Sequence, residues 1–219
     1  MRDLRRRFIP LFLPALFALA LAGCGGPMEL AGIHKVAVLT PFNRTDCPTL
    51  GEEIKRELLR RLSDRVSAEI VDGAAIEAAF APEDLAAVLA DPDCAAELGV
   101  RYGVDALIFG TATYYEQGHE PHFEVRMGTD RGLQANARVD VRVEVGFELK
   151  LLRLADGRIL VAQHAAESAE ETFSIGLDPP SIVLGFSLEP VYPRLREEAV
   201  RAAVRRAIEK VARDYRLNR

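Results

Sequence analysis

The stretch Val139–Leu151 decides the fold class, because it reads VDVRVEVGFELKL with an apolar residue at every odd position. The even positions carry Asp, Arg, Glu, Gly, Glu and Lys. This period of two predicts a β-strand with one face in a core and the other in water. Asp156-Gly157 follows, a dipeptide that tolerates the positive φ of tight turns, so we expect a return strand from Arg158 to about Ala166.

Upstream of this hairpin, short apolar runs alternate with helical patterns. Strands are expected over 35–41, 66–71 and 105–110. Helices are expected from a capping-box pattern at Thr49 to Leu62, in an Ala-rich stretch to Phe80, over 83–89, from Cys94 to about Tyr102 with Asp93 as its cap, and over 195–215. The order β-α-β-α-α-β, then a hairpin and a helix, implies a sheet with parallel members. We therefore predict one three-layer-like α/β domain with a mixed sheet over residues 33–219.

Two segments, 117–137 and 170–190, do not fit this scaffold and are interpreted as inserted β-hairpins. Both alternate apolar and polar residues on either side of a turn signal. Their arms are five to seven residues long before a turn or a proline, whereas a membrane-crossing strand needs about 9 to 11 residues. The alternating apolar positions include Phe123, Val125, Phe173, Ile175, Leu184 and Phe186.

The N-terminus is typical of an exported lipoprotein. Arginines over residues 2–7 precede an apolar stretch, residues 8–22, that is too short to span a bilayer comfortably. It ends in Leu21-Ala22-Gly23-Cys24, which resembles the lipobox of bacterial lipoproteins. We expect residues 1–23 to be a signal peptide, Cys24 to carry diacylglycerol and an acyl chain such as palmitate, and residues 24–32 to be a tether. By the same resemblance, Gly25 favours the outer membrane.

Charge and missing motifs exclude several functions. Removing residues 1–23 removes four arginines and Asp3, which leaves 24 basic and 32 acidic residues, so neither nucleic acid nor anionic lipid headgroups are expected partners. No nucleophile-elbow, phosphate-loop or zinc-protease motif occurs, and we expect neither an enzyme nor a cofactor. His119 and His122 lack an evident third ligand, so no metal is expected. The Arg-rich last helix could suggest an acidic partner, but interspersed acidic residues favour a solvated face.

Two cysteines remain after Cys24. Cys47 and Cys94 both lie in turn-like contexts, Asp46-Cys47-Pro48 and Asp93-Cys94. An exported chain meets an oxidising compartment, where a disulfide between them is permitted. Two small buried thiols are the other interpretation, and both stay open.

The order of several motifs resembles one superfamily. They are Val36–Thr45 (VAVLTPFNRT), Leu50–Ile54 (LGEEI), Ala95–Gly99 (AAELG), Gly103–Ala112 (GVDALIFGTA) and the Asp156-Gly157 hairpin. This order resembles the curli-secretion (CsgG-like) lipoproteins, the penicillin-binding-protein activator (LpoB-like) lipoproteins and the N-terminal domain of the TolB translocation protein. The resemblance implies a compact α/β domain that binds proteins in the envelope and performs no catalysis. In the curli channel, hairpins at these two places assemble around a ring.

The sequence thus predicts a lipoprotein on the periplasmic face of the outer membrane that acts by protein–protein interaction in envelope assembly or secretion. Its partners would be periplasmic or outer-membrane proteins, with the membrane reached through the lipid anchor and homo-oligomerisation left open. The alternative is an oligomeric CsgG-like secretion channel. Candidate contacts are Phe42, Asn43 and Arg44 in the loop before residue 49, and Phe123, Val125, Phe173, Ile175, Leu184 and Phe186 in the two hairpins.

Overall fold

The computed structural model describes residues 27–128, 132–177 and 188–217, which form one mixed α/β unit. Its elements are β1 (Lys35–Val38), β2 (Phe42–Asn43), α2 (Leu50–Leu62), β3 (Glu69–Asp72), α3 (Ala74–Glu77), α4 (Pro82–Ala90), α5 (Pro92–Tyr102), β4 (Ala106–Gly128), β5 (Gly132–Arg153), β6 (Arg158–Leu177) and α6 (Val191–Leu217). The predicted fold class is confirmed. Within the described residues, no helix is both long and apolar enough to cross a membrane.

The sheet is mixed, with described strands in the order β3-β1-β4-β5-β6 and β2 beside β4. β1 is parallel to both of its neighbours, since Val36 lies opposite Ile70 of β3 and Ala106 of β4. β4, β5 and β6 then pair antiparallel along most of their length. The helical connections produce the parallel half and the Asp156-Gly157 turn produces the antiparallel half, as the element order predicts.

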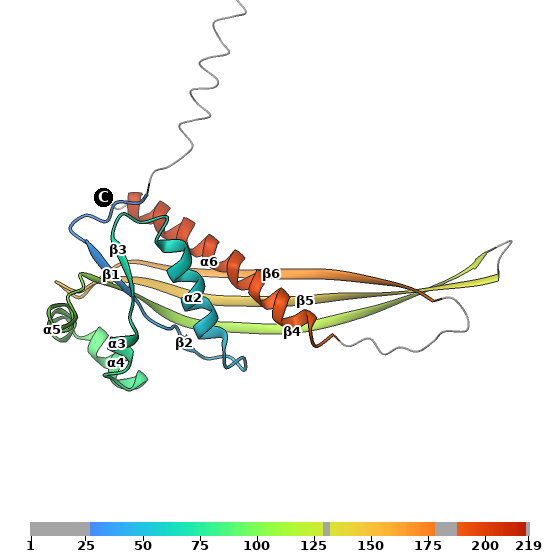
Figure 1. Ribbon diagram of the computed structural model, residues 1–219, viewed down its shortest axis with the longest axis horizontal. Coiled ribbons are helices and arrows are strands. Elements are labelled where there is room, and N and C mark those ends of the chain that lie inside the picture. Colours follow the sequence, from blue (N-terminus) through green and yellow to red (C-terminus); the bar gives the residue numbers. More distant parts are fainter. Residues whose placement is uncertain (1–26, 129–131, 178–187, 218–219) are drawn as a thin grey trace, which may run out of the picture.

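Helices cover both faces of the sheet at one end of the molecule (Figure 1). α2 and α6 pack on the face that carries the odd-numbered apolar residues of β5, and Phe147 is fully buried there. α3, α4 and α5 enclose a second, smaller cluster on the other face, around Leu107 and Leu154. The even positions of β1 thus serve the first cluster and its odd positions the second, which gives three layers around β1 and the start of β4.

Thr49 occupies the N-cap position of α2 as predicted, although without the predicted capping bond, whereas the predicted cap of α5 is wrong. Thr49 adopts a helical conformation and makes no side-chain capping bond; its Oγ1 instead donates to Glu53 Oε1 at 2.9 Å. The cap of α5 is Asp91 rather than Asp93, and its Oδ1 accepts from the backbone N–H groups of Asp93 and Cys94. Pro92 explains the difference, because a proline fits the first turn and therefore starts the helix two residues earlier.

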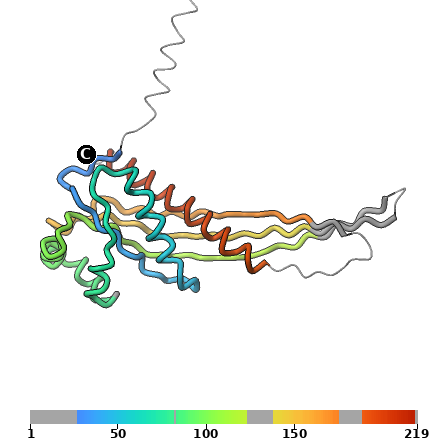
Figure 2. The backbone as a smooth tube through the Cα atoms, viewed as in Figure 1, coloured from blue at the N-terminus to red at the C-terminus, as the bar shows by residue number. Residues whose placement is uncertain are grey.

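The first predicted hairpin is present, with Met127 opposite Leu133, but it is the far end of two continuous long strands rather than a separate insertion. β4 runs for 23 residues and β5 for 22, and their pairing continues to Gly128 opposite Gly132. Figure 2 shows these strands and β6 running side by side past the start of α6. Pro121 does not interrupt β4, since among the described residues β4 pairs beyond Ala112 only with β5, and a proline is tolerated on such an edge.

The second predicted hairpin is corrected in the same way where it is described. Its first arm is the end of β6, which pairs with β5 as far as Leu177 opposite Ala135. The predicted turn and most of the return arm, including Leu184 and Phe186, lie outside the described residues. α6 begins at Val191, a turn earlier than predicted, and buries the predicted stripe of Val200, Val204, Ile208 and Val211.

A buried lysine of α2 forms ion pairs with the end of β3 and with α3. Lys55 of α2 is 5% exposed, and its Nζ lies 2.7 Å from both Asp72 Oδ1 and Glu77 Oε2. Burial opposes its charge, but the hydrogen bonds to Asp72 and Glu77 outweigh burial and raise its pKa. The hydrogen bond from Lys55 in turn lowers the pKa of Asp72.

Replacing this lysine should cost measurable stability. We expect Lys55→Met to lower the free energy of unfolding at pH 7 by about 1–2 kcal/mol, because it leaves the partly solvated carboxylates of Asp72 and Glu77 without their cationic partner. Lys35→Met is the control, since it breaks the exposed pair with Glu69 and should cost less than about 0.5 kcal/mol. Because folding lowers the pKa of Asp72, the stability that its bond to Lys55 contributes is fully present above the unfolded pKa of Asp72. This stability is lost as the pH falls below about 3.8. Urea titrations at pH 7 and pH 3 measure both effects, and equal losses for the two variants would contradict the assignment.

Candidate functional site

The most prominent surface is the part of the sheet that extends beyond the helices. Near the start of α6, the Tyr192 OH lies 3.0 Å from His119 Nδ1 of β4. Val139 and Phe173 are partly buried beside it. We call the residues beyond this point, 122–128, 132–138 and 174–177, the ribbon. The 23 residues of β4, at about 3.3 Å each, give a strand roughly 70 Å long from core to tip.

The register of the ribbon lines up residues of one type across its strands. Phe123 lies opposite Ala137, which lies opposite Ile175. Two residues further on, Val125 lies opposite Ala135, which lies opposite Leu177. Apolar residue types therefore recur at every second register position, while Glu124, Asn136 and Gly176 occupy the row between. The predicted contact residues Phe123, Val125 and Ile175 thus share the ribbon.

The sheet face opposite α6, at the base of the ribbon, is charged. Asp140 accepts from Arg138 Nε at 2.9 Å and from Thr172 Oγ1 at 2.6 Å, and lies 3.2 Å from His122 Nε2. The bonds from Thr172 and Arg138 hold the pKa of Asp140 below its usual value. Arg142 similarly contacts Glu144 and Glu170. This face is solvated, and its ion pairs therefore contribute little stability.

Both outer strands of the ribbon present open backbone edges. In the described part of the chain, β6 pairs only with β5, and β4 beyond Ala112 also pairs only with β5. An unpaired edge offers a row of N–H and C=O groups to an incoming strand. The ribbon therefore has the geometry for strand addition from either side.

The loop predicted as a second contact surface lies far from the tip of the ribbon. Phe42 and Asn43 form β2, which pairs with Thr111 and Ala112 of β4. Twelve strand residues, roughly 40 Å, separate Thr111 from Phe123, so the two predicted surfaces are not brought together. Asn43 builds the loop itself: its Oδ1 accepts from Thr45, and its Nδ2 donates to the carbonyl of Cys47 at 2.6 Å.

The other predicted contact residues are placed less favourably. Phe42 is half-buried, and Arg44 is exposed, with its backbone N–H donating to the carbonyl of Ala112. Phe173 is partly buried against the α6 core rather than presented on the ribbon. Cys24, Leu184 and Phe186 lie outside the described residues.

The disulfide considered between Cys47 and Cys94 does not form, and both thiols are free. Cys47 is buried in the α2/α6 cluster, where Arg196 Nη1 lies 3.4 Å from its Sγ. Cys94 is exposed on α5, which packs on the other face of the sheet. The sheet therefore separates the two thiols.

The histidines do not assemble a metal site. His119 bonds to Tyr192, whereas His122, three residues along the same strand and so on the other face, contacts Asp140. No group of three metal-ligating side chains occurs within the described ranges.

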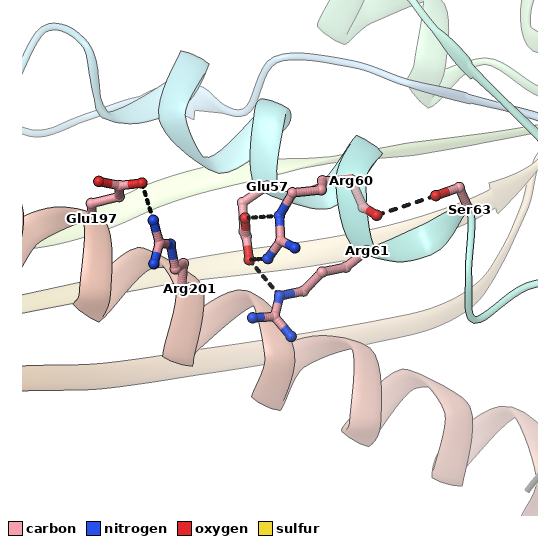
Figure 3. Close-up of polar contacts among 6 residues, drawn as sticks. All are labelled: Glu57, Arg60, Arg61, Ser63, Glu197 and Arg201. Carbon is pink, nitrogen blue, oxygen red and sulfur yellow. Dashed lines mark hydrogen bonds and ion pairs between the residues drawn. The ribbon is translucent and has the colours of Figure 1, made fainter.

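A second surface, which the sequence did not predict, is the seam between α2 and α6. Figure 3 shows Arg60 and Arg61 converging on Glu57 of α2, while Arg201 bonds to Glu197 on the facing α6. Burial opposes the charge of Glu57, but the hydrogen bonds from both arginines outweigh it and lower its pKa. Further along, the seam opens into a hollow of about 650 Å³ that we call the arginine groove. It is lined by Arg60, Arg61, Asp64 and Arg65 from the α2 side, by Arg205, Glu209, Arg213 and Arg216 from α6, and by the apolar residues Met28, Ile208, Ala212 and Leu217.

No protein-family model matches the sequence, and no curated protein matches it. The solved structures that resemble the fold include bacterial lipoproteins. One is lipoprotein GNA1162 from Neisseria meningitidis, 17% identical, with a TM-score of 0.43 over 74% of this chain and 96% of that one. Another is a PelC dodecamer from Paraburkholderia phytofirmans, 18% identical, with a TM-score of 0.35 over 81% and 91%. A third is the LpoB C-terminal domain from Salmonella enterica, 12% identical, with a TM-score of 0.34 over 70% and 92%. At such low identities and TM-scores, these likenesses do not bear on the role of this chain.

Proposed function

We propose that this chain is an envelope lipoprotein, anchored through diacylglycerol and an acyl chain on Cys24, that acts by protein–protein contact through the ribbon. The ribbon is the single observation that carries the proposal. It extends three strands beyond the helices that cover the core, with open edges on β4 and β6. A domain that needed only to fold would gain little from strands that project past their own core, because exposed edges are an aggregation liability.

The anchor part of the proposal rests on residues 1–24. A basic start, a short apolar stretch and Leu21-Ala22-Gly23-Cys24 together fit export followed by lipidation. Gly25 after the cysteine supports the outer membrane as the destination. Because β4 as a whole is roughly 70 Å long, its far end in the ribbon could then contact periplasmic or outer-membrane partners well away from the core of a membrane-anchored domain. This role in envelope assembly or secretion requires no cofactor.

A CsgG-like secretion channel is the second candidate, and one observation favours it. β4 and β5 are continuous, so Pro121 does not shorten the first hairpin as the sequence suggested. Beyond the last residues packed near α6, however, β4 contributes only the seven residues 122–128. A membrane-crossing strand needs about 9 to 11 residues, and therefore protein contact is the first choice.

Photo-crosslinking in cells tests the contact surface. We expect benzoylphenylalanine at Val125 or Ile175 to yield discrete adducts of higher mass after illumination. The matched control is Val100, which is 87% exposed on α5 at the other end of the molecule. Adducts from Val100 alone, or from none of the three positions, would overturn the assignment of the ribbon as the contact surface.

The mass of the adduct separates the two candidate functions. A partner of different mass supports an adaptor, whereas a ladder at multiples of the chain mass identifies copies of this chain as neighbours. Light scattering on the chain from residue 24 with Cys24→Ser, with and without mild detergent, decides between them. A ring-sized species that appears in detergent would favour the channel.

A further inference from the structure

The arginine groove carries more positive charge than its own neighbours neutralise. Six arginines line it, against only two acidic residues, Asp64 and Glu209. Arg60 and Arg61 are occupied by Glu57. The other four, Arg65, Arg205, Arg213 and Arg216, are exposed and form no ion pair with any residue in the described part of the chain.

Helix ends account for only part of this excess. α2 ends at Leu62 and α6 at Leu217, so both carboxyl ends lie at the groove. Each helix end carries about half a negative charge, which basic side chains stabilise. The two helix ends together carry about one negative charge, and Asp64, Glu209 and Glu57 carry one each. The six positive charges of the arginines therefore exceed the negative charge by roughly two. An overall acidic chain has therefore concentrated unpaired guanidinium groups at one place.

Guanidinium groups around an open hollow are suited to phosphate. Each presents a planar fork of N–H donors that matches two phosphate oxygens, and arginine is less strongly hydrated than lysine. The apolar floor, which includes Met28, Ile208 and Leu217, also suits the glycerol and first methylene groups of a lipid better than a fully hydrated ion.

The groove also lies where the chain approaches its proposed anchor. Met28 lines the groove and is fixed there, since its backbone N–H donates to the carbonyl of Arg65 at 2.7 Å. Cys24 precedes it by four residues, which can span at most about 14 Å. That distance is comparable to the ~8–10 Å screening length in physiological salt, so a membrane at Cys24 would feel the charge of the groove.

We propose that the arginine groove binds the phosphate groups of anionic lipid headgroups in the leaflet that holds the Cys24 lipid. This inference rests on the proposed anchor for its geometry. Figure 1 places the end of α6 and the tip of the β4–β5 ribbon at opposite ends of the long axis. Headgroup binding at the groove would therefore give the anchored domain a defined orientation, with the ribbon directed away from the membrane surface.

Vesicle flotation tests this with the chain from residue 24 carrying Cys24→Ser, which retains every described residue. We expect it to bind phosphatidylcholine vesicles containing about a third phosphatidylglycerol, and not pure phosphatidylcholine. R65Q/R213Q/R216Q should bind at least roughly tenfold more weakly, because each basic residue near an anionic surface adds to the attraction. R44Q/R101Q/R158Q is the matched control, because it removes the same charge from exposed sites elsewhere and should bind like the parent chain.

Three results would overturn the proposal. One is equal weakening in the two triple variants, which would indicate only net charge. Another is equal binding to both kinds of vesicle. The third is arginine-dependent binding of inorganic phosphate, seen by calorimetry, without binding to the anionic vesicles, which would indicate a soluble anion. Because this chain carries no lipid, failure here leaves the proposed lipidation of Cys24 untouched.

Discussion

Replacing Cys24 by serine is expected to move the protein from the membrane fraction to the soluble fraction almost completely. Each buried methylene group of an acyl chain contributes about 0.8 kcal/mol, and two or more chains hold a protein stably where a single chain does not. Quantitative immunoblots of fractions washed in 1 M salt measure the change.

The salt wash separates the anchor from the arginine groove. At 1 M salt the screening length falls to about 3 Å, so attraction between arginines and headgroups is lost while lipid insertion is not. Cys94→Ser is the matched control, because that thiol is exposed and unpaired and its loss should leave the protein in the membrane. A Cys24→Ser protein that has lost residues 1–23 and still sediments after the wash would refute the anchor. So would a mature protein whose N-terminal peptide has no added lipid mass.

The elements that the sequence predicted well are those whose burial follows a simple period. The odd positions of Val139–Leu151 alternate without a break, and all of them face the α6 side of the sheet. Val200, Val204, Ile208 and Val211 recur at helical spacing and are buried on α6. In both cases one face meets a core along the whole element, so the pattern records the fold directly.

The lengths of the long strands could not be predicted, because their signals are interrupted locally. Gly118 and Pro121 both disfavour a strand when judged by propensity. In the structure they lie on the outer side of the sheet, where β4 has no second partner among the described residues and the missing N–H of Pro121 is tolerated. The tertiary position of an edge strand is not recorded in its own residues.

The arginine groove was missed for a different reason. Its arginines come from residues 60–65 and 205–216, about 140 residues apart, and in each segment acidic residues are interspersed. Within one helix this mixture favours a solvated face. Only the packing of α2 against α6 brings the unpaired arginines of the two segments together. The sequence also could not place Cys47 and Cys94, since similar turn contexts lie on opposite faces of the sheet.

Two glycines in the same strand differ in what surrounds them. Gly110 of β4 lies opposite Leu149 of β5, and a Cβ added to it would fall 1.9 Å from the carbonyl oxygen of Glu148. Backbone cannot yield as a flexible side chain can, so the two strands would have to separate there. Gly118, eight residues along, has nothing within 4 Å of the corresponding position.

Gly110→Ala should therefore be one of the most destabilising single-methyl additions in the chain. We expect a loss of at least about 3 kcal/mol, since overpacking a rigid site typically costs 1–3 kcal/mol and here the obstacle is backbone. For a domain of this size that lowers Tm by roughly 6–12 °C. Gly118→Ala should change stability by less than about 1 kcal/mol, with gain favoured because alanine restricts the unfolded chain. Circular dichroism melts of both variants measure the contrast. Similar Tm values for the two would show that β4 and β5 do not approach at Gly110 as the register requires. That result would also contradict the conclusion that the ribbon is the end of one continuous β4–β5 pair.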